Sequence, residues 1–275
     1  MRYLILSLVT CFFLSSVISA GTIDPSVPDS KYIAYGKKHE CVVPIRGEVN
    51  VESEDGSVYH FKGSAVIIRP RVIITAAHVV QNTKNAYIIL NGEKIPVLFT
   101  VYTANFDKKD FGSFDIAVGY LQKEAKIKFY PKLYDKKDEL NKVCSIAGYG
   151  VTGTHRTGAV KTDGLKRAGS NVVEQIFNGM LLCGLKKSPP TSLEFLISHG
   201  DSGGGLFIDG KLAGINSCIM TTQNGTLNSD YNDESCHTRI STHKSWIELL
   251  IKELERLDPQ TGKELENKIN LNELF

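Results

Sequence analysis

Ser202 lies in a glycine-rich stretch whose residue types suit a nucleophile. The stretch runs Ser198-His199-Gly200-Asp201-Ser202-Gly203-Gly204-Gly205 and leads directly into the apolar Leu206-Phe207-Ile208. So many glycines are unfavourable inside a helix or strand, but they suit a tight turn whose backbone N–H groups point at a ligand. Taken alone, the stretch also fits a solvated hairpin loop.

Two other residues have the types that a serine nucleophile needs. A hydroxyl is a weak nucleophile at its own pKa, so it needs a base to take its proton and a third group to hold that base in one tautomer. His78 follows an apolar run among small residues, and Asp115 stands in an apolar run where an unpaired charge would be costly to bury. Ser202, His78 and Asp115 therefore fit the roles of nucleophile, base and orienting acid. The N–H groups of Gly200 and Ser202 are candidates for an oxyanion hole.

The segment Gly200–Gly204 also satisfies G-x-S-x-G, the nucleophile turn of α/β-hydrolases such as esterases and lipases. In that class the acid and the histidine both follow the serine. His237 and His243 do follow Ser202, but the surrounding sequence lacks the alternating helices of a doubly wound sheet. This alternative is therefore the less favoured one.

Short β-branched runs separated by turn residues predict an all-β fold. The charged stretch 122–142 has the composition of a linker between two β units. One helix is predicted near the C-terminus, where Ser241 or Thr242 could cap it and apolar residues recur at helical spacing. The final residues, 258–275, form a charged tail. The runs that predict strands are 42–45, 58–61, 65–68, 72–75, 86–90, 95–98, 143–147, 193–197, 206–208 and 212–215.

The N-terminus has the pattern of a secretory signal, with Arg2, an apolar run and small residues before a cut between Ala20 and Gly21. An uncleaved membrane anchor is the alternative, but no basic stop-transfer cluster follows the run. We therefore expect a secreted protein that is not held at a membrane once the signal is removed. Residues 21–32 are polar and are expected to form an exposed leader or propeptide.

Composition and motifs exclude several function classes. The 275 residues are 42% hydrophobic and 23% charged, with a formal net charge of +2, as in ordinary globular proteins. No basic stripe with interleaved aromatic residues suggests nucleic acid. No CxxC pair or HExxH motif suggests a metal, and we expect no cofactor.

Taken together in chain order, three blocks resemble the signature of the trypsin/chymotrypsin family of serine proteases. They are Thr75-Ala76-Ala77-His78, Asp115-Ile116-Ala117 and Gly200-Asp201-Ser202-Gly203-Gly204. The resemblance extends over roughly residues 33–250 and includes Gly148-Tyr149-Gly150 and Asn216-Ser217. In the family, the serine at position 217 supports the triad aspartate.

The resemblance implies a fold and an activity. The fold would be two six-stranded antiparallel β-barrels with a C-terminal α-helix and the active site in the cleft between them. The activity would be hydrolysis of peptide bonds through an acyl-enzyme, with His78, Asp115 and Ser202 as the catalytic triad. The partners would be protein or peptide substrates and protease inhibitors. A catalytically inactive binding protein on the same fold is the alternative.

The cysteine pattern departs from the family. Lys62 and Val79 stand where the family has the disulfide that braces the catalytic histidine, and Ser198 replaces a cysteine near the nucleophile. Removal of the signal leaves five cysteines, so at least one is unpaired within the chain. Cys218 and Cys236 fall on strands that face each other in the family, which predicts a disulfide between them. Pairing of the other three, Cys41, Cys144 and Cys183, stays open.

The resemblance also implies activation by a new N-terminus that pairs with the aspartate before the nucleophile, here Asp201. Ile33 is the family-like N-terminal residue, but a cut after Lys31 would expose Tyr32 instead. Three alternatives remain: another cut is used, the extra residue is tolerated, or this protein is not activated through its N-terminus. Asp201 would then only organise its turn.

The expected substrate pocket is apolar. Leu196 falls at the pocket base with Ile197 beside it, and Ser217, Cys218 and Ile219 form the wall, which favours a small or medium aliphatic side chain in the substrate. Cleavage after basic residues is the alternative if an acidic residue of the loop 221–234 reaches the pocket; the candidates are Asp230, Asp233 and Glu234. Asn224 in this loop begins an N-glycosylation sequon.

Overall fold

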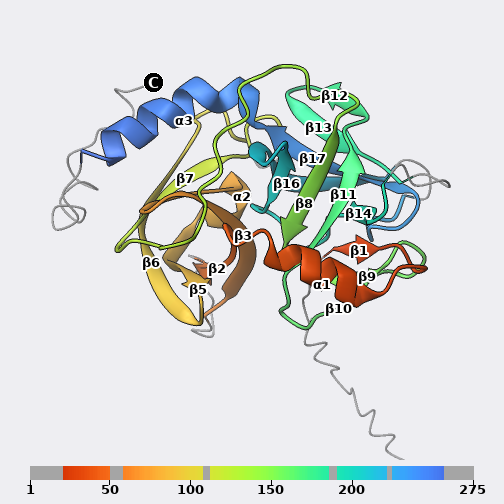
Figure 1. The fold of residues 1–275 in the computed structure, drawn as a ribbon. Helices are drawn as coiled ribbons and strands as arrows, with labels where there is room; N and C mark the ends of the chain where they lie inside the picture. The colour runs from red at the N-terminus through yellow and green to blue at the C-terminus, as the bar shows by residue number, and fades with distance from the viewer. Residues whose placement is uncertain (1–20, 50–57, 108–111, 186–190, 222–224, 257–275) are drawn as a thin grey trace, which may run out of the picture.

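A computed structural model describes residues 21–49, 58–107, 112–185, 191–221 and 225–256. Its first unit is a closed antiparallel barrel with the strand order β2-β3-β4-β7-β6-β5 (Figure 1). Fully buried isoleucines fill the barrel, and the left-handed Asn91 and Gly92 form the tight turn between two of its strands. The strands are β2 (Val42–Val49), β3 (His60–Arg69), β4 (Val72–Thr75), β5 (Thr83–Leu90), β6 (Glu93–Tyr102) and β7 (Ala117–Leu121).

The second unit is a curled sheet of seven antiparallel strands in the order β11-β8-β15-β16-β17-β13-β12. The prediction of an all-β fold with two antiparallel units is confirmed, but this unit is not the closed six-stranded barrel that was expected. Among the described residues its edge strands β11 and β12 do not pair; β11 packs against helix α1 instead. The strands are β8 (Val143–Gly148), β11 (Arg167–Val172), β12 (Gln175–Phe177), β13 (Met180–Cys183), β15 (Gly205–Ile208), β16 (Lys211–Thr221) and β17 (Asp233–Arg239).

A small third sheet holds the N-terminal residues. Its order is β10-β9-β1-β14, and β1 runs parallel to β9 and antiparallel to β14. Thr22 pairs with Leu196, and Ile23 pairs with Phe195. The strands are β1 (Thr22–Ile23), β9 (Thr152–Thr154), β10 (Gly158–Lys161) and β14 (Phe195–Leu196).

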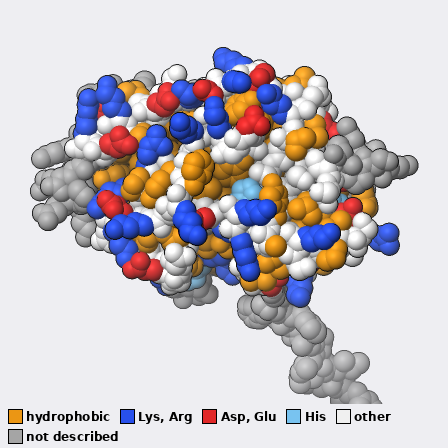
Figure 2. Space-filling model, viewed as in Figure 1, with side chains coloured by type: hydrophobic (Ala, Val, Ile, Leu, Met, Phe, Trp, Pro, Cys, Tyr) orange, Lys and Arg blue, Asp and Glu red, His pale blue; other side chains and the backbone are white. Residues whose placement is uncertain are grey.

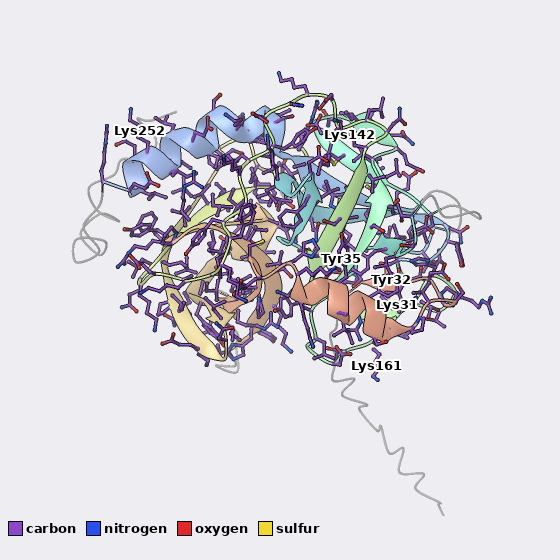
Figure 3. All side chains as sticks on the ribbon, viewed as in Figure 1. Lys31, Tyr32, Tyr35, Lys142, Lys161 and Lys252 are labelled. Atoms are coloured by element: carbon purple, nitrogen blue, oxygen red, sulfur yellow. The ribbon has the colours of Figure 1, made fainter. Side chains whose placement is uncertain are left out.

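Residues 21–32 are therefore not an exposed leader. Helix α1 (Asp29–Lys37) follows β1, and Tyr32 and Tyr35 lie on its face turned toward the strands (Figure 3). Tyr32 is fully buried, and its hydroxyl donates to the Glu194 carbonyl oxygen at 3.1 Å. Asp29 forms a two-point ion pair with the buried Arg167. The segment is polar in composition but folds through these long-range contacts, which local sequence patterns do not reveal.

The predicted C-terminal helix is confirmed as α3 (Ile240–Leu254). It packs on β7 and β16, and Ile247, Leu250 and Leu254 are buried. The expected serine or threonine cap is absent: the helix begins at Ile240, so Ser241 and Thr242 lie inside its first turn, and Arg239 at the N-cap position makes no side-chain cap. The residues after position 256, including the predicted tail, lie outside the described residues.

Charge is distributed over the surface. In the face shown in Figure 2, lysine and arginine side chains are interspersed with acidic and apolar ones rather than gathered into one patch. None of the helices within the described residues is both long and apolar enough to span a bilayer.

Candidate active site

His78 and Asp115 come together at one end of the first barrel. His78 lies in the short helix α2 (Ala77–Val80), directly after β4, and Asp115 lies just before β7, which pairs with β4. His78 Nδ1 is 2.7 Å from Asp115 Oδ2, and the His78 backbone N–H donates to Asp115 Oδ1 at 2.9 Å. Because the carboxylate only accepts, Nδ1 carries the hydrogen of the neutral ring and Nε2 is left as the basic nitrogen.

Ser217 on β16 supplies a further donor to the same carboxylate. Its hydroxyl donates to Asp115 Oδ2 at 2.6 Å. Asp115 is fully buried, so these three donors replace the water that the carboxylate loses. Ser217 thus occupies the supporting position that the family resemblance implied. A buried carboxylate held in this way keeps the His78 ring in one orientation.

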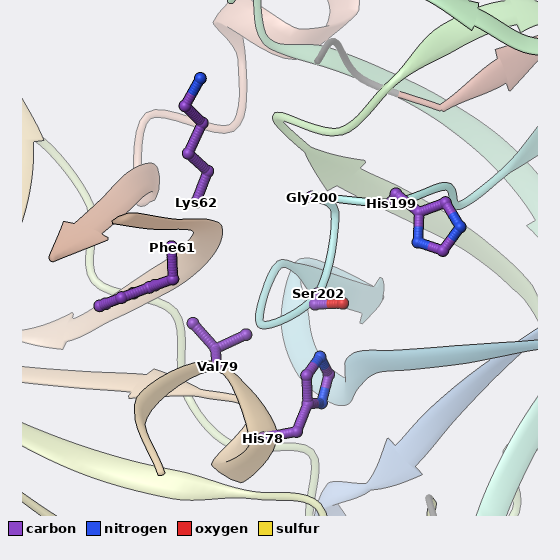
Figure 4. A pocket seen from close by; sticks show the side chains of 7 residues that line it. All are labelled: Phe61, Lys62, His78, Val79, His199, Gly200 and Ser202. Carbon is purple, nitrogen blue, oxygen red and sulfur yellow. The ribbon is translucent and has the colours of Figure 1, made fainter. Parts of the chain in front are cut away.

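Ser202 lies beside His78, on the turn before β15. Figure 4 shows the His78 ring next to Ser202, with one ring nitrogen turned toward the serine side chain. The Ser202 hydroxyl points at the Ser217 carbonyl oxygen, at a long 3.5 Å.

The turn that carries Ser202 requires glycine. Gly200 and Gly203 have φ values of +92° and +83°. A Cβ atom on Gly203 would lie 2.1 Å from the Ser64 carbonyl oxygen, so no side chain fits there. The left-handed Gly200 directly precedes Asp201 and Ser202, and its N–H and that of Ser202 are the two that the sequence assigned to an oxyanion hole.

Ser64 is a site residue that the sequence analysis missed. This fully buried serine lies on β3 of the first barrel. Its hydroxyl donates to the Gly200 carbonyl oxygen at 3.0 Å and accepts the Tyr149 N–H at 3.0 Å, while its own N–H donates to the Ser202 carbonyl oxygen at 2.8 Å. A lone serine in an apolar strand carries no local signal of this role, because its partners come from distant parts of the chain.

Asp201 is fully buried behind the nucleophile turn and accepts three backbone N–H groups. Their donors are Gly21 at 2.9 Å, Gly150 at 2.8 Å and Ser198 at 2.8 Å. Burial raises the pKa of Asp201 to about 6, against the lowering effect of these hydrogen bonds. Ile33, the N-terminal residue considered in the sequence analysis, lies within α1. The backbone nitrogen that reaches Asp201 belongs to Gly21 instead.

The predicted pocket residues divide into two groups. Leu196 and Ile197 are buried in and beside β14, where Ile197 N–H donates to Ser235 Oγ at 2.9 Å and its carbonyl oxygen accepts the Ser229 hydroxyl at 2.8 Å. Ser217, Cys218 and Ile219 lie along β16 next to Ser202, with Cys218 and Ile219 half-buried. The expected pocket base is therefore packed.

A cavity of about 290 Å³ lies next to Ser202 on the side of His78, away from the predicted pocket residues on β14 and β16. None of Leu196, Ile197, Cys218 and Ile219 lines it. Figure 4 shows Lys62 pointing away from Ser202 and Val79 lying between Phe61 and His78. The cavity is lined by Phe61, Lys62, His78, Val79, His199, Gly200 and Ser202.

Two of the three acidic loop candidates for basic specificity are engaged in their own loop. Asp233 is buried, and its Oδ2 accepts the N–H groups of Ser229 at 2.6 Å and Asn228 at 3.0 Å. Asp230 accepts the Asn232 N–H at 2.8 Å. For Glu234, burial raises the pKa of the carboxyl, helped by the nearby Glu174. Asp230 and Asp233 are therefore bound within their own loop.

None of the five cysteines within the described residues is linked in a disulfide in this structure. Cys218 and Cys236 are paired residues of the neighbouring strands β16 and β17, and a hydrogen bond from Cys236 lowers the pKa of Cys218. Their disulfide stays a prediction. Asn224 lies outside the described residues.

Comparison with known proteins agrees with this architecture. The family model of trypsin matches residues 37–247, so the chain belongs to the trypsin family of serine proteases. Neuropsin, a serine protease expressed in the limbic system of mouse brain, is similar in fold with a TM-score of 0.59 and 17% identity, over 78% of this chain and 95% of neuropsin. The HL collagenase structure also has a TM-score of 0.59, with 14% identity over 78% of this chain and 94% of that one. No curated protein matches the chain in sequence.

Proposed function

We propose that this protein is a secreted serine endopeptidase with His78, Asp115 and Ser202 as its catalytic triad. The observation that carries the proposal is the arrangement around Asp115, which accepts both His78 Nδ1 at 2.7 Å and the Ser217 hydroxyl at 2.6 Å. With Nδ1 held by Asp115, Nε2 is the nitrogen of the neutral His78 ring that can act as base toward Ser202. The targets are protein or peptide substrates, and protease inhibitors would bind the same site.

The chemistry follows from these positions. Ser202 Oγ attacks the peptide carbonyl carbon while His78 Nε2 takes its proton, and Asp115 stabilises the imidazolium that forms. The N–H groups of Gly200 and Ser202 donate to the oxyanion of the tetrahedral intermediate. His78 then gives the proton to the leaving amine, and the resulting acyl-enzyme is hydrolysed by water activated by the same histidine.

The cavity beside His78 supports a site for the leaving-group side of the substrate. His78 protonates the leaving amine, so the part of the substrate that departs must lie on the His78 side of Ser202. The cavity walls there are apolar at Phe61 and Val79 and basic at the exposed Lys62. On the acyl side, the packed Leu196 and half-buried Ile219 favour a small or medium aliphatic side chain.

Labelling with a fluorophosphonate probe tests the proposal. The probe reacts with activated serine nucleophiles, so we expect labelling of the secreted protein and none of Ser202→Ala. In triads of this kind, loss of the nucleophile costs about 10⁶ in kcat. Ser64→Ala is not a suitable control because it contacts the turn, whereas Ser145→Ala on β8 leaves the triad untouched. A folded protein that fails to label would contradict the proposal and favour a binding protein on a protease fold.

A further inference from the structure

Asp201 is a buried carboxylate, and none of the lysine, arginine or histidine side chains in the described ranges forms an ion pair with it. In the part of the chain that the structure describes, its oxygens are met by backbone N–H groups and the Ser198 hydroxyl. Neutral donors alone compensate poorly for taking an ionised carboxylate out of water. The site therefore lacks a positive charge that would match Asp201.

Of the three backbone donors, only Gly21 can acquire that charge. The nitrogens of Gly150 and Ser198 are internal amides of the folded body. Gly21 N lies 2.9 Å from Asp201 Oδ2 and is the first backbone nitrogen after the predicted signal segment. Cleavage of its bond to Ala20 would turn it from a neutral amide into an α-ammonium group at the same place.

The structure around Gly21 holds this nitrogen in position. Gly21 is buried with φ +45°, and a Cβ atom there would lie 2.0 Å from Phe195 Cζ and 2.8 Å from the Leu196 carbonyl oxygen. The next residue, Thr22, pairs with Leu196 and its hydroxyl donates to the Ser229 carbonyl oxygen at 2.6 Å. Only glycine fits, and strand β1 sets its distance from Asp201.

Two independent observations thus meet at one peptide bond. The sequence pattern places a signal cut between Ala20 and Gly21, and the structure places Gly21 N against Asp201. We propose that the Ala20–Gly21 bond is the activation bond of this protein, and that removal of the signal segment itself produces the α-ammonium partner of Asp201. Residues 21–32 then stay in the mature enzyme, and no second cut near Lys31 is needed.

The link to activity runs through the nucleophile turn, and it rests on the proposed protease function. Asp201 lies between Gly200 and Ser202, whose N–H groups form the proposed oxyanion hole. Its own N–H donates to the Ser198 carbonyl oxygen at 3.0 Å, and its carbonyl oxygen accepts the Gly204 N–H at 2.8 Å. An ion pair that fixes Asp201 therefore fixes the turn.

Three forms of the protein test this inference. Residues 1–20 are replaced by a removable tag, and the chain is studied uncut, cut to begin at Gly21, and cut to begin one residue earlier at Ala20. The readouts are the rate of fluorophosphonate labelling, the melting temperature, and the acylation of the α-amino group by an amine reagent, followed by mass spectrometry. Mass spectrometry of the naturally secreted protein identifies its N-terminus.

We expect the form that begins at Gly21 to label at least tenfold faster than the other two and to melt at a higher temperature. Its α-amino group should resist acylation until the protein is unfolded. Asp201→Asn should remove the difference in melting temperature between the forms. Because Asp201→Asn could disturb the fold, the form that begins at Ala20 provides the same comparison with all native side chains present.

The outcomes separate this inference from the proposed function. Equal labelling and equal melting temperatures in all three forms would overturn the inference and leave the protease function standing. A melting difference and a protected amine without any labelling would support the pairing and contradict the protease function. A natural N-terminus at Tyr32 or Ile33 would also overturn the inference.

Discussion

The Ser64 hydroxyl lies 3.0 Å from the carbonyl oxygen of Gly200 and accepts the N–H of Tyr149 at the same distance. One side chain of the first barrel thereby holds the nucleophile turn of the second unit. Both of its partners are next to Asp201 contacts: Gly200 directly precedes Asp201, and Tyr149 directly precedes Gly150, whose N–H donates to the Asp201 carboxylate. This contact across the two units makes the turn sensitive to a residue far from it in sequence.

Ser64→Ala tests that dependence. The change removes the partner of two partly buried polar groups, the Gly200 carbonyl and the Tyr149 N–H, which costs about 1–3 kcal/mol of unfolding free energy. Because the turn carries the proposed oxyanion donors, we expect kcat to fall about tenfold with little change in KM, which corresponds to about 1.4 kcal/mol. Kinetics with a peptide substrate and urea unfolding measure the two effects.

Ser145→Ala is the matched control, since Ser145 also makes a half-buried hydrogen bond, to His39 at 2.9 Å, on a strand away from the turn. It should lose stability without losing kcat. If both variants reduce kcat equally, Ser64 acts only through general stability and its positioning role is wrong.

Two buried histidines should make the protein sensitive to acid. Burial lowers the pKa of His155 to about 4 and that of His237 to about 3. The folded state therefore binds fewer protons than the unfolded state below the ordinary histidine pKa of about 6.5. Their contribution to stability is complete above that pH and is lost as the pH falls toward 4. At pH 5 we expect a loss of about 1–2 kcal/mol for each histidine.

Urea unfolding between pH 7.5 and 4.5 measures this loss. His155→Gln can keep the donor to the Thr22 carbonyl oxygen, which lies 3.1 Å from Nε2, and should flatten the profile. His60→Gln, at an exposed position, should not. An unchanged slope in the His155 variant would contradict the expected role of this residue.

Lys62 should favour acidic residues on the leaving-group side of the substrate. Its side chain stands at the cavity beside His78 and is exposed, so the attraction is modest and screened by salt. We expect Lys62→Gln to lower kcat/KM about three- to fivefold for peptides with glutamate on that side at low ionic strength. Neutral peptides should be cleaved as before.

Lys94→Gln, an exposed lysine over the Tyr87 ring on the first barrel, is the control for a general loss of charge. The same effect in both variants, or no dependence on salt, would contradict a local role for Lys62.

Cleavage should follow small or medium aliphatic residues. The packed Leu196 provides no counter-charge at the pocket base, and Asp233 is bound within its own loop. A peptide library varied at the residue before the cut should show a preference for valine, alanine or leucine. Cleavage mainly after arginine or lysine would refute the expectation and point to an acidic group that moves into the pocket.

Local patterns in the sequence predicted the parts of this protein that depend on neighbouring residues. Runs of β-branched residues between turn residues predicted β2 to β6 of the first barrel and β8, β15 and β16 of the second unit, and the spacing of apolar residues predicted α3. Strands β7, β11, β12, β13 and β17 were not among the predicted runs. The types and order of His78, Asp115 and Ser202 were enough to expect their meeting. The glycines near Ser202 predicted a turn because their backbone conformation is closed to other residues.

Tertiary structure alone decided the features that depend on distant partners. The polar segment at residues 21–32 has no regular spacing of apolar residues that would predict a strand or helix. Strand pairing of Thr22 with Leu196 and the ion pair of Asp29 with Arg167 nevertheless hold it against the rest of the protein. The same strand brings Gly21 to Asp201, which no spacing in the chain indicates. The type of a residue and its neighbours in the chain determine its local conformation. Which distant atoms come into contact is determined by burial and strand pairing across the whole molecule, so these contacts are known only from the folded structure.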